Sequence, residues 1–228
     1  MRAAVAIAAL LAASAAPAAP PLPDTMAQRV LACTACHGKE GRAASDGFYP
    51  RIAGKPAGYL YNQLLAFRDG RRQYTLMTAL IDPLSESYLR EIAEHFAAIE
   101  LPYAAPQPAS ATAELLARGR MLVFDGDPAR QVPACVACHG NRLTGVLPAV
   151  PGLVGLPRDY LNAQLGSWRT GQRQALQPDC MAQIAKALAP QDIAAVSHWL
   201  AAQPVPAPAK PAATLPAKMP LDCGGLAP

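Results

Sequence analysis

The sequence predicts an all-α protein built of two tandem units. Apolar residues recur at helical spacing in several segments, and no segment alternates apolar and polar residues over the length of a strand. A run that starts at Pro50 returns from Pro151 onward at a constant offset. Each half also contains one copy of Cys-x-x-Cys-His. A chain of 228 residues has room for two domains of about 80 to 100 residues each.

The N-terminal segment is typical of an export signal. Arg2 is followed by an apolar run up to residue 16, and Ala-Ser-Ala at residues 13–15 matches a signal-peptidase site. We therefore expect residues 1–15 to be a cleaved signal peptide and the mature chain to be periplasmic. The apolar run is shorter than the roughly 20 residues that a membrane-spanning helix needs, so no transmembrane segment is expected in the mature chain.

The first unit is predicted to cover residues 24–101, and a short helix at 24–32 leads into Cys33, Cys36 and His37. The second unit, residues 112–203, repeats this motif as Cys135, Cys138 and His139 after a helix at about 112–124. Two cysteines three positions apart can form thioether bonds to the two vinyl groups of a porphyrin, and the next residue then places its imidazole under the iron. Each motif therefore predicts one covalently attached haem c.

The Cys-x-x-Cys pair has two other interpretations. A Cys-x-x-Cys pair also occurs in thioredoxin-like dithiols and in zinc sites. Neither requires a histidine directly after the second cysteine in both copies. The export signal also favours haem, because thioether-linked haem and disulfides belong outside the reducing cytosol.

Further helices complete each unit. In the first, one helix follows Pro56, and a last helix begins near Ser85, a suitable N-cap. In the second, the last helix starts at Pro190, which suits a first helical turn. A Pro/Ala-rich connector at residues 102–111 is expected to be extended and stiff. Residues 204–228 form a Pro-rich tail that we expect to be irregular and solvated.

Repeat-equivalent residues are candidates for the walls of the haem pockets. The backbone carbonyls of Pro50 and Pro151 are suited to accept a hydrogen bond from each proximal histidine. Aromatic and basic pairs recur as well, and we expect them to form pocket walls and to neutralise the haem propionates, respectively. These pairs are Tyr59 with Tyr160, Phe67 with Trp168, and Arg68 with Arg169.

The sixth ligand of each iron decides its function, because methionine raises the reduction potential and closes the iron to other ligands. Met77 and Met181 lie at equivalent positions ahead of the last helix of each unit, so they are the predicted ligands. Cys180 is a rival for the second haem, and His95 or His198 are weaker ones. Alternatively, Cys180 forms a disulfide with Cys223, the other cysteine outside the haem motifs.

As a set, these features resemble the cytochrome c4 family. The resemblance covers residues 24–203 and depends on the two haem motifs, the paired Tyr-Leu, Gln-Leu and Gly-x-Arg helices, and the two methionine segments. It implies two class I cytochrome c domains related by pseudo-twofold symmetry and two haem c groups. It also implies one-electron transfer between a quinol-oxidising complex and a terminal oxidase or other reductase.

The resemblance implies redox proteins as partners, such as membrane respiratory complexes or oxidases, with transient docking and no substrate turnover. The formal net charge of +4 is small, so nucleic acid is not an expected partner. Two alternatives remain open from the sequence. One is a dihaem enzyme, similar to a thiosulfate dehydrogenase or peroxidase, with Cys180 as a ligand or one open iron. The other is a cytochrome subunit of a larger dehydrogenase, such as the dihaem partner of a sulfide-oxidising flavoprotein.

Overall fold

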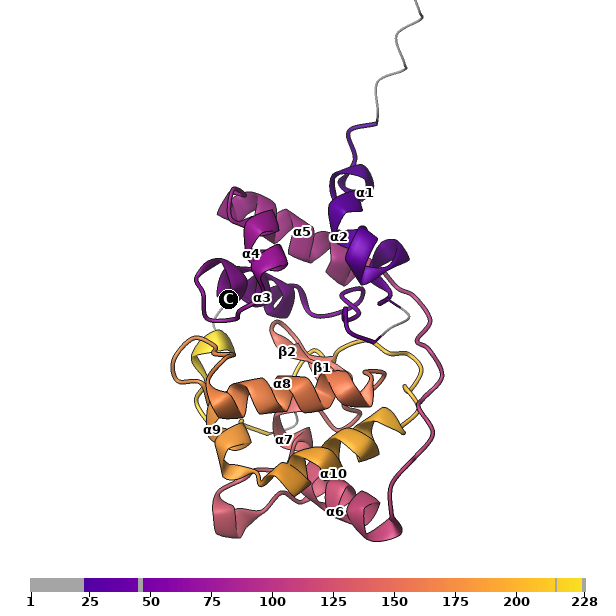
Figure 1. Cartoon of the computed structure of the whole chain (residues 1–228), viewed down its shortest axis with the longest axis vertical. Helices are drawn as coiled ribbons and strands as arrows, with labels where there is room; N and C mark the ends of the chain where they lie inside the picture. The colour runs from indigo at the N-terminus through magenta and orange to yellow at the C-terminus, as the bar shows by residue number, and fades with distance from the viewer. Residues whose placement is uncertain (1–22, 45–46, 216, 227–228) are drawn as a thin grey trace, which may run out of the picture.

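The computed structural model describes residues 23–44, 47–215 and 217–226, so the predicted signal peptide at residues 1–15 lies outside them. The chain forms two helical units that stack on one another (Figure 1). The first unit is indigo to purple, the second runs from magenta through orange to yellow, and the connector runs along one side of both. Among the described residues, none of the helices has the length and hydropathy to cross a bilayer.

The first unit is helical throughout. Its elements are α1 (Met26–Arg29), α2 (Leu31–His37), the 3-10 turn η1 (Lys39–Gly41), α3 (Ala57–Arg68), α4 (Thr75–Ile81) and α5 (Glu86–Ala98). The Oγ of Ser85 accepts a hydrogen bond from the Tyr88 N–H at 3.2 Å, which caps α5 as the sequence predicts. Helix α3 packs against α5 around Leu60 and Phe96. The helix expected at residues 24–32 is divided at Val30 into α1 and α2.

The second unit has its own apolar core. Its elements are α6 (Ala113–Phe124), η2 (Pro128–Arg130), α7 (Val136–His139), β1 (Gly145–Val146), β2 (Val150–Pro151), α8 (Arg158–Thr170), α9 (Cys180–Ala187), α10 (Pro190–Ala201) and η3 (Gly224–Leu226). Helix α10 packs on both α6 and α8, and Leu122, Val196 and Leu200 lie at their contact. The two units therefore have separate cores, as expected for tandem domains.

A small hairpin in the second unit was not predicted. Strands β1 and β2 pair in antiparallel fashion with Gly145 opposite Pro151 and Val146 opposite Val150. Strands of two residues are too short to show the alternation over four to eight residues that identifies a strand in a sequence. The hairpin places Pro151 directly beside the second haem motif.

Close contact between α6 and α10 depends on a glycine. A Cβ atom on Gly119 would lie 2.2 Å from the carbonyl oxygen of Ala195 in α10. We expect Gly119→Ala to lower the free energy of unfolding by about 1–3 kcal/mol, the usual cost of overpacking. Gly166→Ala in α8 is the matched control, because none of the described atoms beyond its own helix lies within 4 Å of that Cβ. The control should raise stability by about 0.5–1 kcal/mol. Chemical denaturation followed by circular dichroism measures both, and equal effects would contradict the packing argument.

The connector is extended and held against the first unit. Residues 102–111 contain neither helix nor strand. The buried guanidinium of Arg51 donates hydrogen bonds to the carbonyls of Leu101 at 2.6 Å and Pro102 at 3.0 Å, and it stacks on the ring of Tyr103. The start of the connector is therefore fixed.

The tail is packed more closely than predicted. The Ala212 N–H donates to the Gly145 carbonyl and the Leu147 N–H donates to the Ala212 carbonyl, both at 2.9 Å, so the tail pairs with the hairpin. Its last described residues return to α9 and α3 (Figure 1). None of the described residues from 204 onward is buried, but these hydrogen bonds fasten the tail to the hairpin. The sequence did not predict this pairing, because backbone pairing with another segment leaves no local sequence pattern.

Candidate haem sites and their shared cavity

Each proximal histidine is held by its own helix and by a carbonyl from a later segment. His37 is the last residue of α2, and its Nδ1–H donates to the Pro50 carbonyl at 2.8 Å. His139 is the last residue of α7, and its Nδ1–H donates to the Pro151 carbonyl at 2.7 Å. These bonds orient both rings and leave Nε2 as the free nitrogen for a metal. Burial lowers the pKa of both histidines, which keeps each imidazole neutral and able to bind iron.

The cysteines of the two motifs do not have the character of a redox dithiol. Burial raises the pKa of Cys135 to about 12 and also raises the pKa values of Cys33 and Cys138. Reactive Cys-x-x-Cys pairs have lowered pKa values instead. A structural zinc site needs four ligands, and the described residues assemble no group of three or more Cys, His, Asp or Glu side chains suited to a metal ion. Of the three interpretations of the motif, only haem attachment fits this environment.

Both motifs open into one cavity of about 790 Å³ that extends through the two units. The four motif cysteines and both proximal histidines line it. Met77 in α4 and Met181 in α9 line it as well. His95 and His198, the weaker candidates for a sixth ligand, are not among the described lining residues. Met219 from the tail is a further lining residue that the sequence did not single out.

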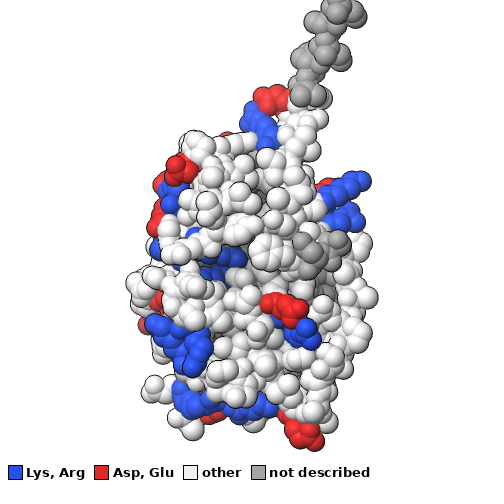
Figure 2. Space-filling view, viewed as in Figure 1, with Lys and Arg blue, Asp and Glu red and all other residues white. Residues whose placement is uncertain are grey.

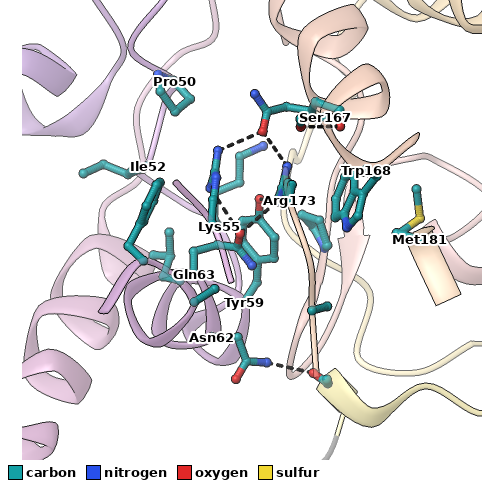
Figure 3. Close-up of a pocket in the computed structure, with 18 of the residues that line it drawn as sticks. Pro50, Ile52, Lys55, Tyr59, Asn62, Gln63, Ser167, Trp168, Arg173 and Met181 are labelled. Carbon is teal, nitrogen blue, oxygen red and sulfur yellow. Dashed lines mark hydrogen bonds between the residues drawn. The ribbon is translucent and has the colours of Figure 1, made fainter. Parts of the chain in front are cut away.

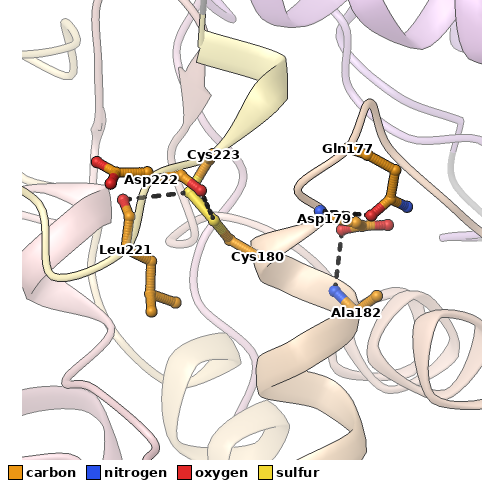
Figure 4. Close-up of a disulfide and its surroundings, with 7 residues drawn as sticks. All are labelled: Gln177, Asp179, Cys180, Ala182, Leu221, Asp222 and Cys223. Carbon is orange, nitrogen blue, oxygen red and sulfur yellow. Dashed lines mark hydrogen bonds between the residues drawn. A yellow bond between two sulfur atoms is a disulfide. The ribbon is translucent and has the colours of Figure 1, made fainter.

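The rival ligand Cys180 is bonded to another sulfur. Cys180 and Cys223 form a disulfide with 5.5 Å between their Cα atoms (Figure 4). A sulfur in a disulfide has no thiolate to offer to iron, so Met181 is the sulfur ligand that this segment can supply. The Asp179 side chain caps α9 by accepting a hydrogen bond from the Ala182 N–H at 3.0 Å. The start of α9, from which Met181 projects, is therefore held by a helix cap and a disulfide.

The aromatic pairs line the cavity as predicted, but the predicted arginine pair does not. Tyr59, Tyr160, Phe67 and Trp168 are all lining residues. Arg68 instead donates to the Glu86 carboxylate at 2.9 Å on the surface. Arg169 donates to the carbonyls of Lys186 and Leu188 at the C-terminal end of α9. The expected propionate role for Arg68 and Arg169 does not fit these positions, because both side chains point to other partners.

Arg72 and Arg173, which are equivalent in the repeat, take the central place between the units. Arg72 donates to Gln63 at 3.1 Å and to Gln164 at 2.9 Å, while Arg173 donates to Gln164 at 2.6 Å and to Gln63 at 2.8 Å. Their backbones form an antiparallel bridge. Figure 3 shows part of this network between the two units. Exchanging the units maps the network onto itself, which is the pattern that pseudo-twofold symmetry produces.

The tyrosines complete the same symmetric network. The Tyr59 hydroxyl lies 3.3 Å from Arg173, and the Tyr160 hydroxyl lies 3.4 Å from Arg72. Each unit thus contributes one tyrosine to the arginine of the other unit. This network between the units is made of residues that correspond to one another in the repeat.

The cavity has a surplus of positive charge. Arg72, Arg173 and Lys55 line it, and none of them forms a salt bridge with another described residue. Burial, together with the charge of Arg72, lowers the pKa of Arg173, and burial lowers the pKa of Lys55 to about 8. Buried cations without an anion are costly. Two haem groups would bring carboxylates into this space, so the residues present fit the cofactor that the motifs predict.

A buried donor gives a second test of this fit. Trp168 Nε1 has no hydrogen-bond partner among the described residues, and leaving a buried N–H unpaired costs about 1–3 kcal/mol. The Arg173 guanidinium stacks on the Trp168 ring, with its Cζ atom 3.7 Å from the ring centroid. A haem carboxylate next to Arg173 would supply an acceptor. The equivalent residue of the first unit, Phe67, has no such donor.

We expect Trp168→Phe to lower the reduction potential of the second haem by less than about 60 mV. For a one-electron couple, about 60 mV corresponds to a tenfold change in the equilibrium constant. Loss of the N–H leaves a haem carboxylate less neutralised, and negative charge stabilises ferric iron. The first haem is the internal control, because Phe67 already lacks a donor. Spectroscopic redox titration measures both potentials, and an equal shift of both haems would contradict this role.

Sequence reasoning missed Lys55, Met219 and the role of the Arg72 and Arg173 pair. The two arginines were visible as the recurring Gly-x-Arg, but a repeat does not reveal which arginine of a helix end points inward. Lys55 corresponds to Leu156, and Met219 lies in a segment without a counterpart. No repeat signal pointed to these last two residues.

No family model matches the chain. It is 37% identical over 142 residues to the thiosulfate dehydrogenase electron acceptor of Thiomonas intermedia (strain K12), covering 62% of this chain and 64% of that relative, just under two thirds of its length. It is 33% identical over 167 residues to cytochrome c4 of Pseudomonas aeruginosa, covering 72% and 80%. The crystal structure of reduced cytochrome c4 from Pseudomonas stutzeri is 30% identical, with a TM-score of 0.67 over 77% of this chain and 95% of that one.

Proposed function

The chain belongs to the cytochrome c4 family of dihaem c-type cytochromes, and from this premise we propose that it is a one-electron carrier. The observation that carries the proposal is the shared cavity, in which a Cys-x-x-Cys-His motif and a methionine from each unit face a common space. Such ligand pairs would hold each iron from both sides. A closed iron exchanges electrons without binding substrate.

The polar network supports electron transfer between the two haems. Arg72 and Arg173 lie between the units, each bonded to side chains of both. This network would hold the haem edges in a fixed relation and restrict movement of the units. The haem groups, when bound, supply the redox chemistry, and the chain supplies attachment, orientation and exclusion of water.

The enzyme alternative has less support. It required Cys180 as an iron ligand or one open iron, and Cys180 is engaged with Cys223. Met181 follows it directly and lines the cavity. We therefore propose that the chain carries electrons for an enzyme and has no turnover of its own.

We propose a thiosulfate-oxidising dehydrogenase as the electron donor, in the periplasm. The support is the likeness to a relative whose name is thiosulfate dehydrogenase electron acceptor. Figure 2 shows Lys and Arg side chains in several separate groups on one face, some of them beside Asp or Glu, with uncharged residues between the groups. A partner would therefore meet this face with little long-range electrostatic steering.

Anaerobic mixing tests the proposal. The oxidised holoprotein, thiosulfate and a bacterial thiosulfate dehydrogenase should together produce reduction of both haems. The holoprotein and thiosulfate alone should give none, which separates a carrier from an enzyme. Reduction by thiosulfate without the dehydrogenase would overturn the carrier proposal. No reduction in the complete mixture would overturn the proposed donor.

A further inference from the structure

The surfaces beside the two predicted methionine ligands differ. In the first unit, Leu76 and Leu80 flank Met77, line the cavity and are 64% and 38% exposed. The equivalent positions in the second unit are Cys180 and Ile184. Cys180 is in the disulfide, and Ile184 packs against the core of its unit. Beside Met77, the cavity therefore opens to an exposed apolar surface of the first unit. The equivalent place in the second unit, beside Met181, is covered.

The cover of the second unit is the C-terminal tail. Met219, Cys223, Gly225 and Leu226 all line the cavity. The Gly224 N–H donates a hydrogen bond to the Pro178 carbonyl at 3.0 Å. The two backbones are so close here that a Cβ atom on Gly224 would lie 2.0 Å from the Gln177 carbonyl oxygen. The disulfide joins the same stretch to the first residue of α9 (Figure 4).

The tail is also tied at both of its ends to other parts of the fold. Upstream, Ala212 pairs with the backbone of the β1–β2 hairpin. Downstream, the Asn62 side chain of α3 donates to the Gly225 carbonyl at 2.7 Å, which connects the tail to the first unit. We call residues 217–226 the strap. Because it is fastened at α9 and at α3, it crosses the boundary between the units.

We propose that the strap closes the second haem site to protein partners, so that a redox partner docks on the first unit over Leu76 and Leu80. This inference rests on the proposed carrier function. Phe48, which is 60% exposed and also lines the cavity, extends the same apolar rim. The stretch that covers the equivalent place in the second unit, Cys-Gly-Gly-Leu at residues 223–226, has no charged side chain. Because Phe48, Leu76 and Leu80 make the rim of the first unit apolar, the partner needs an uncharged, apolar contact surface around its own redox group.

The first arm of the test needs no partner. Haem methyl signals of the oxidised holoprotein report on each haem separately, and a neutral gadolinium chelate broadens those that are near solvent. We expect stronger broadening for the first haem than for the second. The double variant Cys180→Ser/Cys223→Ser should release the strap and raise the broadening of the second haem several-fold. Both cysteines are changed because a free Cys180 thiol beside Met181 would be able to bind the iron. Equal broadening of both haems in the native chain would overturn the proposal.

Asn62→Ala is the second variant, in case the double variant does not fold. It removes only the fastening to α3 and should raise the broadening of the second haem to a smaller extent. If neither variant raises the broadening of the second haem's methyl signals, the strap does not shield this haem and the proposal is wrong.

The second arm locates the docking surface. Leu76→Glu should slow electron uptake from a bacterial thiosulfate dehydrogenase by about tenfold, within the one to three decades by which mutants of one interface differ. Leu176→Glu is the matched control, because Leu176 is 43% exposed and lines the cavity in the second unit. Equal slowing by both changes would overturn the proposal. If the native chain takes up no electrons from this enzyme, the proposed donor is wrong, while the broadening experiment still decides the role of the strap.

Discussion

Replacing Met181 with alanine is expected to lower the reduction potential of the second haem by a large share of the roughly 0.8 V that axial ligands span. A thioether stabilises ferrous iron, and its loss leaves a water or an open position. The structure supports Met181 because it lines the cavity and directly follows the Asp179 cap and the disulfide-bonded Cys180. Met77→Ala should have the same effect on the first haem. Redox titration and the near-infrared sulfur-to-iron band of the oxidised protein measure the result.

Two other methionines provide the controls for this experiment. Met121 belongs to the second unit but packs on its core and lies near Arg118, outside the described lining of the cavity. Met121→Ala should leave both potentials unchanged. Met219 lines the cavity from the tail, so Met219→Ala tests whether the tail supplies the ligand instead. A fall in potential with Met219→Ala and none with Met181→Ala would reject Met181.

Removing the covalent attachment in the second unit should unfold that unit. We expect the variant Cys135→Ser/Cys138→Ser to lose the mass of one haem and a large part of its helical signal. The cavity of about 790 Å³ serves both units, so an empty, rigid space of about half that volume would cost on the order of 10 kcal/mol at about 24 cal/mol per Å³. This is comparable to the roughly 5–15 kcal/mol by which domains are stable. The cofactor is therefore part of the core.

Mass spectrometry and circular dichroism of the exported protein measure this result. The first unit is the internal control, because it has a separate apolar core and should keep its haem. A variant that kept native helicity without the second haem would show that the helices pack without the cofactor. A variant that kept both haem masses would show that Cys135 and Cys138 are not the attachment sites.

The helices and the haem motifs were predictable because their determinants are local. Attachment needs two cysteines and a histidine within five residues, and helix ends depend on caps such as Ser85. The repeat then paired Met77 with Met181 and Pro50 with Pro151. The histidine contacts with Pro50 and Pro151 have the geometry expected from the sequence. The hairpin was missed because its strands have two residues each.

The sequence by itself determined that this protein has two equivalent haem-binding units, since covalent attachment and repetition are properties of the chain order. Only the tertiary structure decided what makes the units unequal and how they meet. Arg72 and Arg173, rather than Arg68 and Arg169, line the cavity, and the tail is joined by a disulfide to the methionine segment of the second unit. These contacts join residues that are far apart in the chain. Which side chains they bring together depends on how complete helices pack, and no local pattern of residues records that packing.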